Sequence, residues 1–323
     1  MAKPKVLVTR RWPAAVEAQL SETFDAVLNT GDKPLSETEL RDALKSYDAV
    51  LPTVTDKISA NAFDIAKPQA RILANYGVGY SHIDMSSAAG HGMTVTNTPD
   101  VLSECTADIA MTLLLMVARR AGEGERELRA GEWTGWRPTH LVGTKVSGKT
   151  LGIVGFGRIG QEMARRAHHG FGMKIVVQNR SRVSPDILAR YNATQADSLE
   201  ELMPQCDFVS LHCPGGAANR HLINTRMLNL MKPDAFLINT ARGEVIDELA
   251  LSRALWFETI GGAALDVFDG EPRINPDLMD CDNLVMLPHL GSATREAREA
   301  MGFRVLDNLN DFFAGREPRD RVM

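Results

Sequence analysis

The sequence predicts an α/β protein made of two doubly wound domains, each built around a parallel sheet. Short apolar runs alternate with longer segments of helix-like spacing along most of the chain, which is the pattern of βα repetition. A glycine-rich turn at residues 155–160 follows one of these runs and opens a helix. At 323 residues the chain is also too long for one ordinary domain.

The first part of the chain, up to about residue 97, predicts the first sheet. Thr98-Pro99-Asp100 interrupts its pattern, and a mostly apolar helix follows from Ser103 to Arg120. We therefore place a domain boundary near residue 99. The apolar runs that predict strands before this boundary are residues 5–8, 49–51, 72–74 and Val95.

Residues 122–148, rich in Gly, Trp and basic side chains, predict a connecting arm between the apolar helix and the second sheet. The final helical segment, 294–313, is expected to return to the first domain. The predicted domains are residues 1–98 with 290–323, and residues 99–289. The strands predicted for the second domain are residues 150–154, 174–177, 208–211, 235–238, 262–265 and 284–286.

Composition favours a small-molecule partner in the cytoplasm. The net charge of −5 comes without a long like-charge run, which argues against nucleic-acid or anionic-membrane binding. The four cysteines stand singly, so neither a disulfide framework nor a metal site is expected. The longest apolar stretch, 109–118, is about half of what spans a bilayer. The N-terminus lacks the apolar region of a signal peptide.

The turn Gly155-Phe156-Gly157-Arg158-Ile159-Gly160 predicts a dinucleotide site of the Rossmann type. Glycines there permit a tight turn, a close approach of backbone to pyrophosphate, and packing of the helix on the strand. The free N–H groups of the helix then face the phosphates. An ordinary glycine turn is the alternative, and the strand before it and the helix after it favour the dinucleotide.

The end of the next strand, Asn179-Arg180-Ser181-Arg182, bears on which dinucleotide is bound. NAD-binding proteins of this type place an acidic residue there for the adenosine ribose. Here no carboxylate would repel a 2′-phosphate, and two guanidiniums and a hydroxyl could hold one. NADP(H) is therefore favoured and NAD(H) is left open. A solvated basic loop is the alternative interpretation.

Three polar residues, Arg242, Glu271 and His289, come just after predicted strands. The carboxyl ends of parallel strands line the ligand crevice of such a sheet, so these side chains can converge. Taken singly, they could be a surface ion pair, a turn residue and a core histidine.

Together with the glycine turn, these motifs resemble those of the D-2-hydroxyacid dehydrogenase family over about residues 73–291. Gly131-x-Trp133 with Trp136-x-Pro138 resembles the glyoxylate/hydroxypyruvate reductase branch. The resemblance implies a Rossmann cofactor domain inserted in a flavodoxin-like catalytic domain. It also implies reduction of a small 2-oxo acid.

The resemblance assigns the catalytic roles to Arg242, Glu271 and His289. Reduction of a 2-oxo acid needs a hydride at the carbonyl carbon and a proton at the oxygen, and a histidine suits the proton donor. Glu271 would orient the imidazole and favour its charged form. Arg242 would polarise the carbonyl and hold the carboxylate.

The family also implies contacts outside this triad. The loop residues Val78 and Gly79 would hold the substrate carboxylate through backbone N–H groups. Leu51 would face the substrate side chain, although a core position fits it equally. Trp136 would reach a partner's active site in a homodimer, with arm packing as the alternative. The further implied cofactor contacts are Thr106, His212, Cys213, Pro214, Thr240, Ala241, Asp266 and Gly291.

Two departures from the family pattern leave substrate choice and cofactor geometry open. Ser81 stands where Asp or Asn is common, and Gly215-Gly216-Ala217-Ala218 replaces a Leu-Thr-Pro-Glu-like stretch. The alternatives are a phosphoglycerate or sugar-acid dehydrogenase and a non-catalytic dinucleotide sensor. The sequence has no extra basic cluster that would bind a phosphate, which argues against a phosphoglycerate dehydrogenase. The intact set of Arg242, Glu271 and His289 argues against a sensor.

Overall fold

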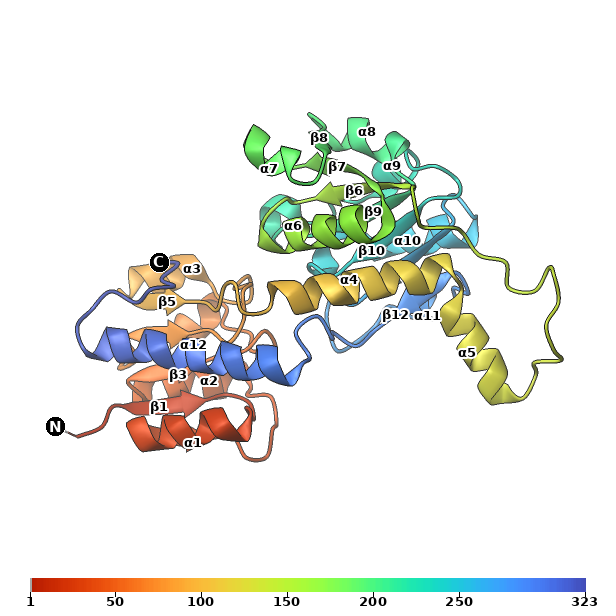
Figure 1. Ribbon diagram of the computed structural model, residues 1–323. Helices are drawn as coiled ribbons and strands as arrows, with labels where there is room; N and C mark the ends of the chain where they lie inside the picture. The colour runs from red at the N-terminus through yellow and green to blue at the C-terminus, as the bar shows by residue number, and fades with distance from the viewer. Residues whose placement is uncertain (1) are drawn as a thin grey trace. The chain divides into compact units, whose positions relative to one another are not determined.

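The computed structural model describes residues 2–323 (Figure 1). The chain divides into two compact units: unit 1 is Met1–Leu102 with Ala293–Met323, and unit 2 is Ser103–Ser292. These boundaries lie a few residues beyond the predicted ones. Residue 1, where the predicted first domain begins, is outside the described residues.

Unit 1 contains a parallel sheet of five strands in the order β2-β1-β3-β4-β5. Four of these strands match the predicted apolar runs. The fifth, β2, was not predicted, because it pairs only with β1 at the sheet edge and none of its residues is fully buried. The strands are β1 (Lys5–Val8), β2 (Asp25–Leu28), β3 (Ala49–Leu51), β4 (Ile72–Ala74) and β5 (Thr94–Thr96).

The helices of unit 1 cover its sheet. The first and the last, α1 (Ala14–Thr23) and α12 (Arg295–Phe313), pack together, and Gly302 leaves the space that Val16 fills. The final helix thus returns to the first unit, as predicted. The other helical segments of this unit are α2 (Glu37–Ser46), η1 (Ala60–Phe63) and α3 (Met85–Gly90).

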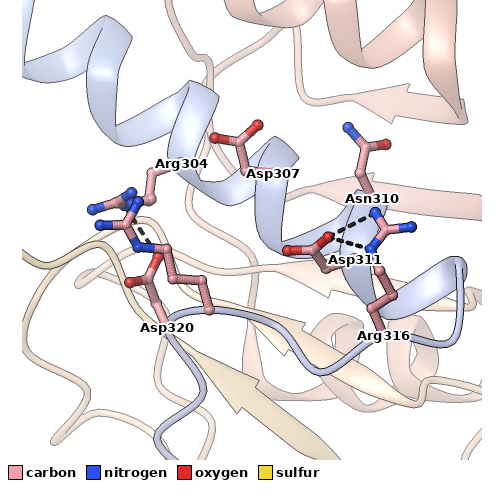
Figure 2. Close-up of a pocket in the computed structure, with 7 residues that line it drawn as sticks. Arg304, Asp307, Asn310, Asp311, Arg316 and Asp320 are labelled. Carbon is pink, nitrogen blue, oxygen red and sulfur yellow. Dashed lines mark hydrogen bonds and ion pairs between the residues drawn. The ribbon is translucent and has the colours of Figure 1, made fainter.

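The segment after α12 is tied back to that helix by charged side chains (Figure 2). Arg304 Nε lies 3.1 Å from Asp320 Oδ2, and both side chains are nearly buried. Asn308 donates to the same carboxylate oxygen at 3.2 Å and accepts from the Asp320 N–H at 3.2 Å. This cluster fixes the C-terminal segment on unit 1.

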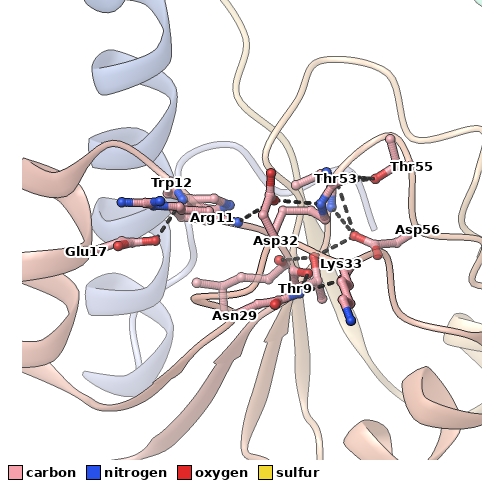
Figure 3. A network of polar contacts seen from close by, with 12 residues as sticks. Thr9, Arg11, Trp12, Glu17, Asn29, Asp32, Lys33, Thr53, Thr55 and Asp56 are labelled. Atoms are coloured by element: carbon pink, nitrogen blue, oxygen red, sulfur yellow. Dashed lines mark hydrogen bonds and ion pairs between the residues drawn. The ribbon is translucent and has the colours of Figure 1, made fainter.

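A polar network closes the carboxyl ends of β1 and β3 (Figure 3). Its centre is Asp56, which is fully buried. One oxygen of this carboxyl accepts from the Thr9 hydroxyl at 2.5 Å and from the Thr53 N–H at 2.7 Å. Burial raises the pKa of Asp56 above its ordinary value, although these hydrogen bonds act to lower it.

Unit 2 contains a parallel sheet of seven strands in the order β12-β11-β10-β9-β6-β7-β8. The chain proceeds in opposite directions on the two sides of β6, so the switch point of this doubly wound sheet lies between β6 and β9. The short edge strand β8 was not predicted. The strands are β6 (Thr150–Val154), β7 (Lys174–Gln178), β8 (Ala193–Gln195), β9 (Phe208–Leu211), β10 (Phe236–Asn239), β11 (Gly262–Leu265) and β12 (Leu284–Met286).

Two apolar clusters cover the faces of this sheet. One is built on α4 (Ser103–Ala118) and α6 (Arg158–Arg165), and a π-helical turn, η2 (Arg166–Gly170), continues α6. The other includes residues of four helices. These helices are α8 (Leu199–Leu202), α9 (Thr225–Leu228), α10 (Glu248–Trp256) and α11 (Pro276–Met279). Besides α5 (Ala121–Ala130), the remaining helical segments of unit 2 are α7 (Pro185–Ala189), η3 (Met203–Gln205), η4 (Ala217–Asn219) and η5 (Gly243–Val245).

Part of the predicted arm is helical, which the sequence analysis missed. Helix α5 (Ala121–Ala130) follows α4, and the chain beyond it loops outward within unit 2 (Figure 1). None of its residues is buried, so no apolar stripe indicated a helix. Its Ala, Glu, Leu and Arg residues have high helix propensity, and Gly131 ends it in a left-handed conformation at φ 74°.

Within residues 2–323, no helix combines the length and apolarity needed to cross a membrane. Over the same residues, no group of three or more His, Cys, Asp or Glu side chains is placed to hold a metal ion.

Candidate active site

The glycine turn connects β6 to α6 at the switch point of the unit 2 sheet. A Cβ on Gly155, whose φ is 90°, would lie 2.6 Å from the Cys213 backbone nitrogen, so the turn packs directly against the end of β9. A Cβ on Gly160 would fall onto the Gly155 carbonyl oxygen. Two of the three glycines are therefore required by packing alone.

The middle glycine faces open space. No atom lies within 4 Å of a Cβ placed on Gly157, which is the N-cap of α6. No side chain caps this helix, so its first N–H groups and the positive end of its dipole remain for an anion. The residues of the turn therefore fit the pyrophosphate of a dinucleotide. Within the turn, Phe156 is buried, Ile159 is partly buried and Arg158 is exposed.

The end of β7 lies beside the turn. Asn179 Oδ1 accepts from the Phe156 N–H at 3.2 Å, and its Nδ2 donates to the Ser181 hydroxyl at 3.2 Å. Arg180 is exposed and makes no ion pair among residues 2–323, whereas Arg182 pairs with Asp197 at 2.7 Å. Both members of that pair are exposed, so the bond is weak enough to exchange for another anion.

Arg242, Glu271 and His289 converge in unit 2. His289 Nδ1 lies 2.8 Å from Glu271 Oε2, and Glu271 Oε1 accepts from the Phe268 N–H at 2.9 Å. Since a carboxylate can only accept, Nδ1 carries a proton and Nε2 is the free ring nitrogen. Arg242 donates to its neighbour's carbonyl, Ala241 O, at 2.7 Å, and none of its nitrogens is buried without a partner.

Gly243 explains how Arg242 comes next to the Glu271 loop. A Cβ on Gly243 would coincide with the backbone of Phe268 and Asp269, so the two loops touch through a residue without a side chain. Gly243 was not predicted as a site residue, because only the fold brings the Phe268 backbone against it.

Charge and burial determine the protonation of this cluster. Burial alone would raise the pKa of Glu271, but the hydrogen bond and the charge of His289, with smaller effects from Phe268 and Arg242, hold it below its ordinary value. Burial lowers the pKa of the Arg242 guanidinium, while the carboxylates of Glu244 and Glu271 oppose that change. Glu271 is therefore ionised beside the imidazole at neutral pH.

The loop that carries His289 is anchored by Asp266, at the end of β11. The buried Asp266 carboxylate accepts the N–H groups of Leu290 at 2.7 Å and Gly291 at 2.8 Å. The Asp266 carbonyl accepts the His289 N–H at 2.9 Å. His289 is thereby held in a left-handed conformation, with φ of 54°. Thr106 of α4 lies close to Gly291.

The ends of β9 and β10 supply the remaining predicted cofactor residues at the same edge of the sheet. His212 Nε2 lies 2.9 Å from the Ser210 hydroxyl, and burial lowers the pKa of His212 to about 4. Its Nδ1 and the Thr240 hydroxyl are buried without a hydrogen-bond partner in the described chain, so both could serve a bound ligand. The other three predicted contacts at these strand ends are Cys213, Pro214 and Ala241.

In unit 1, the loop after β4 turns its carbonyl groups inward. Asn75 Nδ2 donates to the Gly77 and Gly79 carbonyls at 3.0 and 3.1 Å, and Asn97 Nδ2 donates to the Val78 carbonyl at 2.9 Å. In a trans peptide the following N–H points the opposite way. The N–H groups of Val78, Gly79 and the next residue therefore point away from these anchors, as in an anion-binding nest.

The other two residues with predicted substrate roles differ in exposure. Leu51 is completely buried in β3, so within unit 1 it occupies a core position, which was the alternative that the sequence left open. Trp136 has 83% of its surface exposed in the loop beyond α5. Two acidic residues near these sites were not predicted: Asp197, which pairs with Arg182, and Glu244, which lies beside Arg242. No strand-end pattern in the sequence marks either of them.

Comparison with known proteins decides the family. Residues 111–291 match the model of the D-isomer specific 2-hydroxyacid dehydrogenase NAD binding domain. The chain belongs to the D-isomer-specific 2-hydroxyacid dehydrogenase family. This family membership makes it an enzyme, an oxidoreductase that uses a nicotinamide dinucleotide.

Two members of this dehydrogenase family resemble the chain over nearly its whole length. It is 44% identical to glyoxylate reductase of Thermococcus litoralis, over 99% of this chain and 97% of that protein. It is 38% identical to glycerate dehydrogenase of Hyphomicrobium methylovorum, over 98% of each chain.

A solved structure agrees with this assignment. The NADPH-dependent glyoxylate/hydroxypyruvate reductase of Sinorhizobium meliloti, in complex with NADP and malonate, matches with a TM-score of 0.89 and 34% identity. The match covers 99% of this chain and 97% of that one. The two-sheet α/β fold is thus that of the 2-hydroxyacid dehydrogenases.

Proposed function

We propose that this dehydrogenase reduces a small 2-oxo acid of the glyoxylate or hydroxypyruvate kind to the D-2-hydroxy acid, with NADPH as the preferred reductant. The observation that carries the proposal is the 2.8 Å contact between His289 Nδ1 and the Glu271 carboxylate, with Arg242 beside it. The names of the similar proteins, glyoxylate reductase and glycerate dehydrogenase, support the same substrate class.

The residues of unit 2 supply what the reaction needs besides a hydride, which a bound dihydronicotinamide would provide to the carbonyl carbon. His289 donates the proton of Nε2 to the carbonyl oxygen, and the ionised Glu271 stabilises the doubly protonated ring before transfer. Arg242 places its remaining N–H groups on the carbonyl and the carboxylate of the substrate.

The test is steady oxidation of NADPH, followed by its absorbance, with glyoxylate or hydroxypyruvate as substrate. His289→Asn should lower kcat by about 10²- to 10⁴-fold, the range of general acid catalysis, while NADPH binding is kept. A variant with near-original turnover would refute the role of His289. Binding of NADPH without turnover on a panel of 2-oxo acids would favour a sensor instead.

The preference for NADPH over NADH is assigned to Arg180, Ser181 and Arg182. Arg180 has no competing anion, and Arg182 can leave its exposed pair with Asp197. Arg180→Ala combined with Arg182→Ala should lower kcat/KM for NADPH by about tenfold or more relative to NADH, since two charge-assisted contacts are lost. Arg190→Ala, an exposed arginine of the same region, is the control. An unchanged ratio would refute the assignment.

The loop containing Val78 and Gly79 is assigned to the substrate carboxylate. Its inward-turned carbonyls leave consecutive N–H groups for an anion. Asn97→Ala should release the Val78 carbonyl and raise KM more than it lowers kcat. An unchanged KM would contradict this role of the loop. Leu51 lies at the end of β3, and a side-chain contact with the substrate stays a prediction for it.

A homodimer is proposed through the arm, residues 122–148. Its exposed apolar side chains are Leu128, Trp133, Trp136 and Val142. Such side chains on an extended element indicate a protein interface, and a second copy is the partner that the family resemblance implies. Trp136→Ser with Leu128→Ser should lower the mass measured by light scattering from dimer to monomer. Trp256→Ser, an exposed tryptophan outside the arm, is the control.

A further inference from the structure

A second carboxylate, that of Glu244, lies beside Arg242. Glu244 belongs to the η5 turn that directly follows Arg242, and its Oε1 accepts the Gly216 N–H at 3.1 Å. A Cβ on Gly215 would fall onto that same oxygen and would lie 2.8 Å from Arg242 Cγ. The Glu244 carboxylate and the stem of Arg242 therefore both lie against the Gly215–Gly216 backbone.

This arrangement depends on the stretch that departs from the family pattern. A leucine at position 215 could not be accommodated, because its Cβ would already overlap with Glu244 and crowd Arg242. Gly216 has φ of 98°, which favours glycine as well. The two glycines thus make room for the Glu244 carboxylate beside the stem of Arg242.

The unused oxygen of this carboxylate is available to act on a ligand. Glu244 Oε2 makes no hydrogen bond among residues 2–323 and is not buried without a partner. Glu271, in contrast, uses both oxygens, one on His289 and one on the Phe268 N–H. Glu244 is the carboxylate near Arg242 that is free to repel an anion.

The other charges nearby do not cancel this effect. Arg220, a cation of the same loop region, is paired with Asp269 at 2.9 Å. Glu248 adds another carboxyl group, which accepts the Asp269 N–H at 2.7 Å. Arg242 can therefore balance one substrate carboxylate, while the charge of Arg220 is already opposed by that of Asp269.

We propose that Glu244 is a specificity-determining residue that restricts the enzyme to 2-oxo acids with an uncharged side chain. The carboxylate common to all 2-oxo acids is matched by Arg242, whereas a second carboxylate or a phosphate meets Glu244. Monoanions such as hydroxypyruvate are accepted and dianions are rejected. This inference rests on the proposed function and goes beyond it by naming the charge of the substrate side chain.

Glu244→Gln tests the inference, because glutamine keeps the length and the acceptor for the Gly216 N–H while removing the charge. The measurement is kcat/KM with NADPH for hydroxypyruvate, a monoanion, and for oxaloacetate, a dianion. We expect the oxaloacetate-to-hydroxypyruvate ratio to rise about tenfold, mainly through KM for oxaloacetate. The gain should shrink at high ionic strength, since salt screens charges. Malonate should also become a stronger inhibitor.

Two further variants separate charge from structure. Glu244→Asp keeps the charge and should keep the original ratio. Glu200→Gln removes an equal charge from a distant surface pair with Arg226 and should also leave the ratio unchanged. An unchanged ratio in Glu244→Gln, or an equal loss with both substrates, would overturn the inference. If the original protein reduces no 2-oxo acid, the proposed function itself fails.

Discussion

Glu271→Gln separates the electrostatic role of Glu271 from its place in the packing. Glutamine has the same length, and its carbonyl oxygen can still accept the Phe268 N–H that Glu271 binds at 2.9 Å. What disappears is the negative charge 2.8 Å from His289 Nδ1. The protonated imidazole, which is the form that donates the proton, then loses its anionic partner.

The size of the effect follows from the exposure of the pair. Hydrogen bonds to charged groups contribute about 1.5–3 kcal/mol, and about 1.4 kcal/mol corresponds to a tenfold change in rate. The two side chains are 29% and 30% exposed, so solvent screening favours the lower end of that range. The value of kcat/KM for reduction should therefore fall about tenfold at neutral pH.

The assay is kcat/KM for hydroxypyruvate and NADPH, measured at neutral pH and an ionic strength of about 0.1 M. Glu248→Gln is the matched control, because Glu248 also binds a backbone N–H of this loop, that of Asp269, without touching His289. Its kcat/KM should stay near the original value. An unchanged kcat/KM in Glu271→Gln, or an equal loss in Glu248→Gln, would refute the electrostatic role.

Three further predictions concern the fold. Gly243→Ala should lower the stability by about 2 kcal/mol or more and should also lower the activity, because the new Cβ overlaps with Phe268. Thermal unfolding measures the stability and kcat/KM the activity; a protein unaffected in both would contradict the packing. Asp56→Asn should stabilise the protein, and this gain should grow as the pH rises from about 4, because the raised pKa of Asp56 means that its ionisation opposes folding. Thermal melts at several pH values measure the gain, and a gain that falls with pH would contradict the prediction. Asp320→Ala should cost about 3 kcal/mol in urea unfolding, because Arg304 loses its buried partner and is left with the longer pair with Asp100 at 3.8 Å; a loss below about 1 kcal/mol would show that the pair is dispensable.

The strands with the clearest apolar signal in the sequence are those buried on both faces. Residues 208–211 and 262–265 are apolar or small throughout, and every one of them is buried in the sheet. The edge strands β2 and β8 were missed because half-exposed edges carry mixed residues. Helix α5 was missed because it buries no face and therefore has no apolar period.

The candidate site was predictable where a residue type follows a strand, as for Arg242 and His289. The supporting contacts were not, because they join positions far apart in the chain. Glu244 is an ordinary acidic residue in the sequence, and only the space at Gly215 shows what it touches. The pair between Arg182 and Asp197 likewise depends on how the loops fold.

The backbone of His289 has a consequence for protein engineering. Its φ of 54° costs a non-glycine residue about 1 kcal/mol, and Asp266 and Leu287 hold it there through their carbonyl groups. Glycine at position 289 would relieve this strain, but it would discard both the proton donor and its hydrogen bond to Glu271. Thermostabilisation of this enzyme should select on turnover at high temperature, so that this conformational tension is preserved.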